Sequence, residues 1–253
     1  MHLPEIDKYS HIRSPFSSWD PRVKIVSLSI LIVSVVLTPG LTLASIGLVL
    51  AIILFLISRI PVRFALIHLR WVLLFALFFF IVMPLTVPDR IIARISFISI
   101  SLDGVRLAAL VALRAISAVI LIFPMIATSR FDITIKALQK LKVPDKLVQL
   151  IMFSYRYIFV IMGEVRRMLT AARIRGLTGA PIASRLRITG NILGMLFIRS
   201  FERTQRTYQA MTSRGYDGRL KTLGEFSLCG TDFLKASLII GLAVLLNIAG
   251  WLL

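Results

Sequence analysis

Two segments of the chain repeat one arrangement of arginine, alanine and glycine. Residues 167–177 read RMLTAARIRGL and residues 206–216 read RTYQAMTSRGY, so the copies begin at Arg167 and Arg206, 39 residues apart. In each copy an arginine, an alanine and a second arginine stand four residues apart, and glycine follows at once. Four residues on an α-helix turn by about 400°, so the three side chains share one face of a helix.

This arrangement suits contact with another protein. Ala171 and Ala210 keep the shared face thin, and the glycine is typical of a residue that ends a helix. Each copy therefore predicts an arginine, Arg175 or Arg214, at a helix C-terminus. A guanidinium group has five donors in a rigid fork that fits carboxylates and backbone carbonyls. Two such ends on consecutive helices predict two equivalent acceptors on a paired partner.

The composition indicates a membrane protein. The chain has 253 residues, of which 57% are hydrophobic, and its mean hydropathy is +0.87. Soluble domains are nearer 45–50% apolar. The formal net charge is +18, and residues 130–221 contain 18 Lys/Arg but only five Asp/Glu. This basic segment is too charged to span a bilayer and too apolar to be disordered.

Apolar stretches predict the membrane helices. Each is near the roughly 20 residues that cross a bilayer, and they are residues 23–38, 41–58, 71–87, 105–128 and 234–253. Pro84 should kink or end the third helix, and Arg114 stands inside the fourth. Asp20 can cap the first helix, with Pro21 at its first position and Arg22 following.

The charges of the connections predict the orientation. Three segments are basic: the N-terminal flank, which includes Lys24, the second connection, and the segment after the fourth helix. The first connection is uncharged, and the third has equal numbers of acidic and basic residues. This alternation follows the positive-inside rule. It places the N-terminus and residues 130–233 in the cytoplasm and the C-terminus outside.

The basic segment is predicted to hold three helices, over residues 131–141, 144–175 and 183–214. Pro144 and Pro181 suit the first turn of the two long helices, and Gly176 and Gly215 suit their C-terminal caps. Apolar residues recur on one face of each long helix, with most charges elsewhere. Basic patches also bind nucleic acid, but membrane topology already accounts for these charges, so we expect no nucleic-acid partner.

The sequence gives no sign of catalysis by this chain. The phosphate-binding pattern G-x-x-x-x-G-K-[ST] is absent from it, so the chain should not hydrolyse ATP. His2, His11 and His68 do not form a metal-ligand cluster, and we expect no metal or cofactor on this chain, although an N-terminal metal contact by His2 and His11 stays open.

The motifs resemble those of the transmembrane T component of energy-coupling factor (ECF) transporters. The family signature is a pair of Ala-Arg-Gly motifs ending two coupling helices, which stand here as Ile174-Arg175-Gly176 and Ser213-Arg214-Gly215. Isoleucine and serine replace the alanine. The helix-start motif Asp20-Pro21-Arg22 is also similar to the family, and the N-terminal sequence is most similar to the cobalt-transport, or CbiQ-type, subgroup.

The resemblance implies an all-α, L-shaped polytopic membrane protein with about five transmembrane helices and three cytoplasmic coupling helices. Residues 1–129 would form the N-terminal membrane region, 130–231 the coupling helices and 232–253 a final transmembrane helix. It also implies a multi-pass protein of a prokaryotic inner membrane.

The resemblance further implies the partners. Two ATP-binding cassette ATPases would bind ATP and Mg and receive Arg175 and Arg214, while a membrane-embedded S component would capture the substrate. A small accessory membrane subunit is a further possible partner, and the lipid bilayer surrounds the complex. Cobalt is the expected ion, with nickel or a vitamin such as biotin as alternatives. Arg114 would pair with the S component, face the helix bundle or reach to the membrane surface.

A different function also fits some of these residues. A membrane enzyme acting on lipid or isoprenoid phosphates would use cytoplasmic arginines to hold the phosphate. Such an enzyme needs paired acids for a metal ion, and the acids of the basic segment are scattered. The non-catalytic coupling subunit is therefore the preferred interpretation.

Overall fold

A computed structural model describes residues 14–86, 91–95, 98–218 and 230–252. These residues form eight α-helices, a two-stranded hairpin and one short 3₁₀-helix, which confirms the all-α class. The chain divides into two compact units. One contains the residues up to Ala137 together with α8, and the other runs from Leu138 to Gly224.

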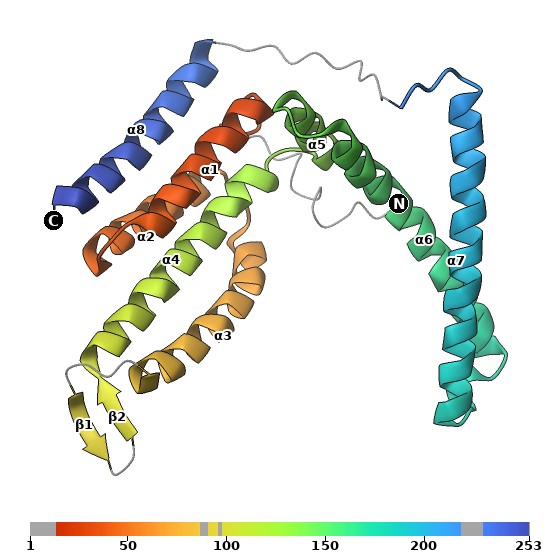
Figure 1. Ribbon diagram of the computed structural model, residues 1–253, viewed down its shortest axis with the longest axis horizontal. Helices are drawn as coiled ribbons and strands as arrows, with labels where there is room; N and C mark the ends of the chain where they lie inside the picture. Colours follow the sequence, from red (N-terminus) through yellow and green to blue (C-terminus); the bar gives the residue numbers. More distant parts are fainter. Residues whose placement is uncertain (1–13, 87–90, 96–97, 219–229, 253) are drawn as a thin grey trace. The chain divides into compact units, whose positions relative to one another are not determined.

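The first unit is a bundle of five apolar helices (Figure 1). They are α1 (Pro21–Leu37), α2 (Leu41–Ile57), α3 (Val62–Thr86), α4 (Leu102–Ile126) and α8 (Gly230–Leu252). Helix α4 packs against α1, α2 and α3, and α1 packs in turn against α8. The core between them includes Leu28, Leu31 and Leu121, which are fully buried.

Length and apolar composition allow four of the described helices to cross a membrane, namely α3, α4, α6 (Asp145–Ile174) and α8. Helix α2 is apolar but has 17 residues, and α1 also has 17. At 1.5 Å per residue, 17 residues cover about 25 Å of a hydrocarbon core that is about 30 Å thick. The four longer helices make the chain a membrane protein.

Much of the bundle surface is apolar, as a lipid-facing surface must be. Trp71, Leu74 and Phe78 of α3 are each more than half exposed. In water an apolar surface of this extent would mark a binding face, but hydrocarbon tails are as apolar as these side chains. Helix α3 begins nine residues before the predicted stretch and therefore includes Arg63 and Arg70. Pro84 lies inside α3, which ends two residues later at Thr86.

Polar contacts join α1, α4 and α8 inside the bundle. Arg114 of α4 donates from Nη2 to the carbonyl oxygen of Thr38 at 2.5 Å, just after α1 ends. Ser34 donates to the carbonyl oxygen of Ala243 at 2.8 Å, and Asn247 donates to the Ser34 hydroxyl at 2.6 Å. Of the alternatives that the sequence left open for Arg114, the structure therefore shows the one in which it faces the bundle.

A short hairpin connects α3 to α4, where the sequence indicated only a loop. Strands β1 (Ile91–Ile95) and β2 (Ile98–Ser101) pair antiparallel, from Ile91 with Ser101 to Ile95 with Ile98. The β-branched isoleucines of this segment favour extended backbone. Ser101 then caps α4 by accepting from the Gly104 amide at 3.4 Å.

The second unit is built on two long helices. Helices α6 and α7 (Ile182–Thr212) are joined through the 3₁₀-helix η1 (Leu177–Gly179). Helix α5 (Phe131–Lys140) precedes them, and the boundary between the two units falls within it, after Ala137. Their start points correct the sequence analysis slightly. Pro144 and Pro181 stand at the N-cap rather than in the first turn, where the absent proline N–H again leaves no helix bond unmade.

The close approach of α3 and α4 depends on Gly104. A Cβ atom there would lie 2.7 Å from the Met83 carbonyl oxygen and 2.7 Å from the Pro84 Cα. We predict that Gly104→Ala destabilises the bundle by about 1–3 kcal/mol, because backbone atoms must move apart. The measurement is thermal unfolding of detergent-solubilised protein. Gly241→Ala in α8 is the matched control, since its Cβ would meet nothing within 4 Å. Equal melting temperatures for the two variants would contradict the prediction.

Candidate functional site

The first arginine of the repeat stands where α6 ends. The helix finishes at Ile174, Arg175 is the C-cap residue, and Gly176 follows with φ +92°. That left-handed conformation costs an L-residue energy but not glycine, and the Arg175 amide still donates to the Ala171 carbonyl at 3.1 Å. Arg175 is exposed and Ile174 is 83% exposed.

The second arginine has the same local setting at the end of α7. The helix finishes at Thr212, Ser213 is the C-cap residue, and Arg214 comes next. Gly215 has φ +81°, and the Tyr216 amide donates back to the Met211 carbonyl at 3.1 Å. Arg214 therefore lies one residue farther beyond the cap than Arg175 does, and it too is exposed.

Both helix ends are open to a partner. Among the residues that the structure describes, neither arginine side chain makes a hydrogen bond or ion pair. A Cβ atom built on Gly176 or Gly215 would meet nothing within 4 Å. The remaining residues of the two predicted faces are also exposed, and they are Arg167, Ala171, Arg206 and Ala210.

The antiparallel pairing of α6 and α7 separates the two arginines. Near the start of α6, Gln149 accepts from the Tyr216 hydroxyl at 2.6 Å and donates to the Gly218 carbonyl at 2.9 Å. These contacts hold the segment just after α7 beside the first turns of α6. Arg214 therefore lies at one end of the pair and Arg175 at the other, roughly 33 Å apart along the helix axes. The sequence predicted both helix ends but not that they lie at opposite ends of the helix pair.

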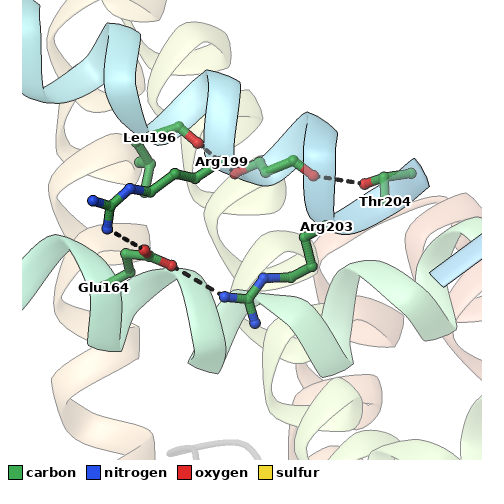
Figure 2. Close-up of polar contacts among 6 residues, drawn as sticks. Glu164, Leu196, Arg199, Arg203 and Thr204 are labelled. Carbon is green, nitrogen blue, oxygen red and sulfur yellow. Dashed lines mark hydrogen bonds and ion pairs between the residues drawn. The ribbon is translucent and has the colours of Figure 1, made fainter. Parts of the chain in front are cut away.

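An ion-pair cluster joins the two helices near their middle (Figure 2). Glu164 of α6 accepts from Arg199 Nη1 at 2.8 Å through one carboxylate oxygen and from Arg203 Nη2 at 3.3 Å through the other. Tyr157 and Thr207 share a further hydrogen bond of 3.1 Å. Sequence reasoning missed this cluster, since it counted Glu164 among the scattered acids.

An apolar groove lies between the two helices. Its volume is about 640 Å³. Phe153, Ile158 and Met162 of α6 line it, together with Ser200 and Thr204 of α7. Part of the predicted apolar face thus packs between the helices, while Ile158 stays 50% exposed in the groove.

The helix-start motif forms a local ion pair. Asp20 is the N-cap of α1, with Pro21 at the first position, as predicted. Its carboxylate accepts from the Arg22 amide and from Arg22 Nη2, both at 2.9 Å. Burial raises the pKa of Asp20, but the hydrogen bonds and charge of Arg22 outweigh burial and hold that pKa below its usual value.

Lys24 departs from the sequence analysis, which placed it on the charged N-terminal flank. It is fully buried, and its ammonium group donates to Thr128 Oγ1 at 2.9 Å and to Ser129 Oγ. The Phe16 carbonyl oxygen accepts from it at 3.5 Å. The lysine thus joins the segment before α1 to the segment between α4 and α5, a contact between residues too distant in the chain for local patterns to predict.

Within the described ranges, no group of three His, Cys, Asp or Glu side chains could hold a metal ion. His68 is exposed, and its Nδ1 lies 2.9 Å from the Phe64 carbonyl oxygen. His2 and His11 lie outside the described residues.

Comparison with known proteins gives the family. The model of the cobalt transport protein family, CbiQ, matches residues 13–223. The energy-coupling factor transporter transmembrane protein EcfT of Thermanaerovibrio acidaminovorans is 31% identical over 84% of this chain and 83% of its own length. EcfT of Bacillus subtilis is 28% identical over 84% of both chains. A putatively fused cobalt transport protein CbiMQ of Methanocorpusculum labreanum is 33% identical over 47% of this chain and 20% of its own length.

The helical membrane bundle and these matches together define an ECF-type transmembrane transporter component. The chain belongs to the CbiQ cobalt transport family.

The Asp20 cap yields a prediction with a pH dependence. Asp20→Ala should lower stability by about 1 kcal/mol at neutral pH, because it removes the cap and the partner of Arg22. The folded pKa of Asp20 is depressed, so its contribution is present above the unfolded pKa of about 3.9 and is lost as pH falls through the folded value. Melting temperatures of the two proteins should therefore converge below about pH 4.

Asp20→Asn is the control for that prediction. Asparagine caps a helix about as well as aspartate, so this variant should keep most of the capping contribution and lose the dependence on acid. A difference between the native protein and Asp20→Ala that persists unchanged on acidification would contradict the assigned cause.

Proposed function

We propose that this chain is the coupling subunit of an ATP-driven ECF-type importer and links two cytoplasmic ATPases to a substrate-binding S component. The observation that carries the proposal is the pair of exposed Arg-Gly helix ends at opposite ends of α6 and α7. One chain thereby offers two equivalent guanidinium groups to two equivalent receptors. Acidic residues on the ATPases would accept from Arg175 and Arg214.

The proposal places α5, α6 and α7 on the cytoplasmic side, with the N-terminus, and the C-terminus outside. The positive-inside pattern of the connections supports this orientation. Helix α6 is apolar and long enough to span, but its second half carries Glu164, Arg166, Arg167 and Arg173. Charges at this density are costly in hydrocarbon, which favours a position at the membrane surface or on a partner.

The apolar groove between α6 and α7 would receive the S component. Its lining is largely apolar, with arginines at its margin. A partner that leaves the lipid to dock there would exchange one apolar contact for another. Such an interface can therefore form and release without a large cost of dehydration.

The two helices would transmit motion between the partners. Closure of the ATPase dimer on ATP would move its two receptors together, and each rigid helix would carry that displacement toward the S component. ATP and Mg would stay on the ATPases. The residues of this chain would supply only binding and geometry, which is consistent with a non-catalytic subunit.

The phosphate-binding enzyme is less well supported. An enzyme that held one phosphate would need converging arginines, whereas Arg175 and Arg214 lie at opposite ends of the helix pair. Glu164 is already occupied by two arginines. It is therefore poorly placed to bind the metal that such chemistry uses.

The coupling role predicts the effect of removing both arginines. Losing one partner of a buried interfacial ion pair costs about 2–5 kcal/mol. Arg175→Ala combined with Arg214→Ala should leave a membrane-inserted protein that captures at least tenfold less of its organism's ECF ATPases on co-purification. Substrate uptake should fall in parallel.

The control removes the same charge elsewhere. Arg156 and Arg187 are exposed, and the described residues offer their side chains no partner. Arg156→Ala combined with Arg187→Ala should capture ATPases at the native level. Native capture and native uptake by the Arg175/Arg214 double variant would refute the proposed site.

We further propose cobalt as the transported ion, with nickel or a vitamin such as biotin as alternatives. The family and the name of the fused relative support this choice. In vesicles that contain the reconstituted complex of this chain with its S component and ATPases, ATP should drive accumulation of radiolabelled cobalt. Accumulation of nickel or biotin in place of cobalt would contradict the choice of ion and leave the coupling role intact.

A further inference from the structure

The carboxylate of Glu164 occupies a special position on the helix pair. Its side chain is 12% exposed, although its two partners, Arg199 and Arg203, are 52% and 40% exposed. Each carboxylate oxygen accepts from a different arginine (Figure 2). Among the described residues, this cluster supplies the ion pairs that join α6 to α7.

The internal repeat relates the members of this cluster to one another. Glu164 and Arg203 are 39 residues apart, the same offset that separates Arg167 from Arg206 and Arg175 from Arg214. Equivalent positions of the two copies therefore meet where the helices cross. Two elements that touch at equivalent positions are related by an approximate two-fold axis through that contact.

This axis gives the pair two equal arms. Glu164 precedes Arg175 by 11 residues, and Arg203 precedes Arg214 by 11 residues. At 1.5 Å per residue each arm is about 16 Å long. A cluster at the crossing thus sits midway between the two arginine-glycine ends, where a small change of angle moves both ends equally.

We propose that Glu164, with Arg199 and Arg203, is a clasp that sets the crossing of α6 and α7 and so positions Arg175 and Arg214 symmetrically for two receptors. The need to place Arg175 and Arg214 symmetrically rests on the proposed function. The clasp itself consists of contacts within this chain and does not depend on that function. Glu164 is a positioning residue, since it acts through the helices and lies away from both helix ends.

The chemistry of the cluster suits this role. Apolar packing is non-directional and allows helices to rotate against each other, with crossing angles that scatter by about 15–20°. Charged hydrogen bonds from two guanidinium groups to the two oxygens of one carboxylate restrict direction as well as distance. On an arm of about 16 Å, a rotation of about 20° would move each end by about 6 Å.

The other contacts of the pair leave this task to the clasp. Tyr157–Thr207 lies between the clasp and the Arg214 end, and Gln149–Tyr216 lies just beyond Arg214. Toward the Arg175 end, η1 joins the helices covalently. The clasp is therefore the polar contact closest to the middle of the pair, where its loss would loosen the crossing angle of the two helices.

The test measures the distance between the two helix ends by pulsed electron paramagnetic resonance. Spin labels are attached to cysteines at Thr178 and Gln209, both exposed, in a full-length chain whose single Cys229 is replaced by serine. The protein is held in lipid nanodiscs without ATPase or substrate. The native chain should give one narrow distance distribution.

Glu164→Arg should at least double the width of that distribution, because three guanidinium groups then face one another. Glu202→Arg is the matched control, since Glu202 is exposed and adjacent to Arg203 but outside the clasp. It should leave the width unchanged. Adding Arg203→Glu to Glu164→Arg restores an oppositely charged pair and should return the native width.

A native width for Glu164→Arg, or no recovery in the charge-exchanged double variant, would overturn the proposal. Where Glu164→Arg fails to fold, Glu164→Gln decides: a broadened distribution supports the clasp, and an unchanged one overturns it. ATPase capture by the Arg175/Arg214 variant tests the coupling role separately. If the Arg175/Arg214 variant captures ATPases normally while the Glu164 variant broadens the distance distribution, the coupling role fails and the clasp stands. If capture is lost while the Glu164 variant keeps the native width, only the clasp fails.

Discussion

The antiparallel contact between α6 and α7 is the constraint on which the geometry of the candidate site depends. Each helix ends in arginine and glycine, so the direction of the helices decides where the two guanidinium groups lie. Parallel helices would present them side by side, whereas antiparallel helices present them at opposite ends. The contacts of Gln149 with Tyr216 and of Glu164 with Arg199 hold that arrangement in register.

The membrane bundle meets a different constraint, because its buried polar groups have little access to water. Arg114, Ser34 and Lys24 each donate to a carbonyl or hydroxyl oxygen of another segment. An unpaired polar group would be costly in such surroundings. The same contacts that reduce this cost also join segments far apart in the chain, although Arg114 Nε is buried without a hydrogen-bond partner among the described residues.

Local patterns predicted the elements well. The two arginine frames, the glycines after them and the Asp20 cap all depend on residues within about four positions of one another, and such interactions form in any context that allows the helix. Predictions failed where the outcome depends on more distant partners. Lys24 reads as part of a charged flank, yet its partner Thr128 stands 104 positions later.

The sequence by itself determined the two long helices, their C-terminal ends and the exposure of Arg175 and Arg214, because helix termination is decided within one or two turns of backbone. Only the tertiary structure decided that these arginines lie at opposite ends of one helix pair and that Glu164 meets Arg199, 35 positions away. Packing of α6 on α7 selects that register from many that the apolar faces would permit. The charge pattern alone does not specify it, since the pair offers two carboxylates near its middle, Glu164 and Glu202, and many arginines.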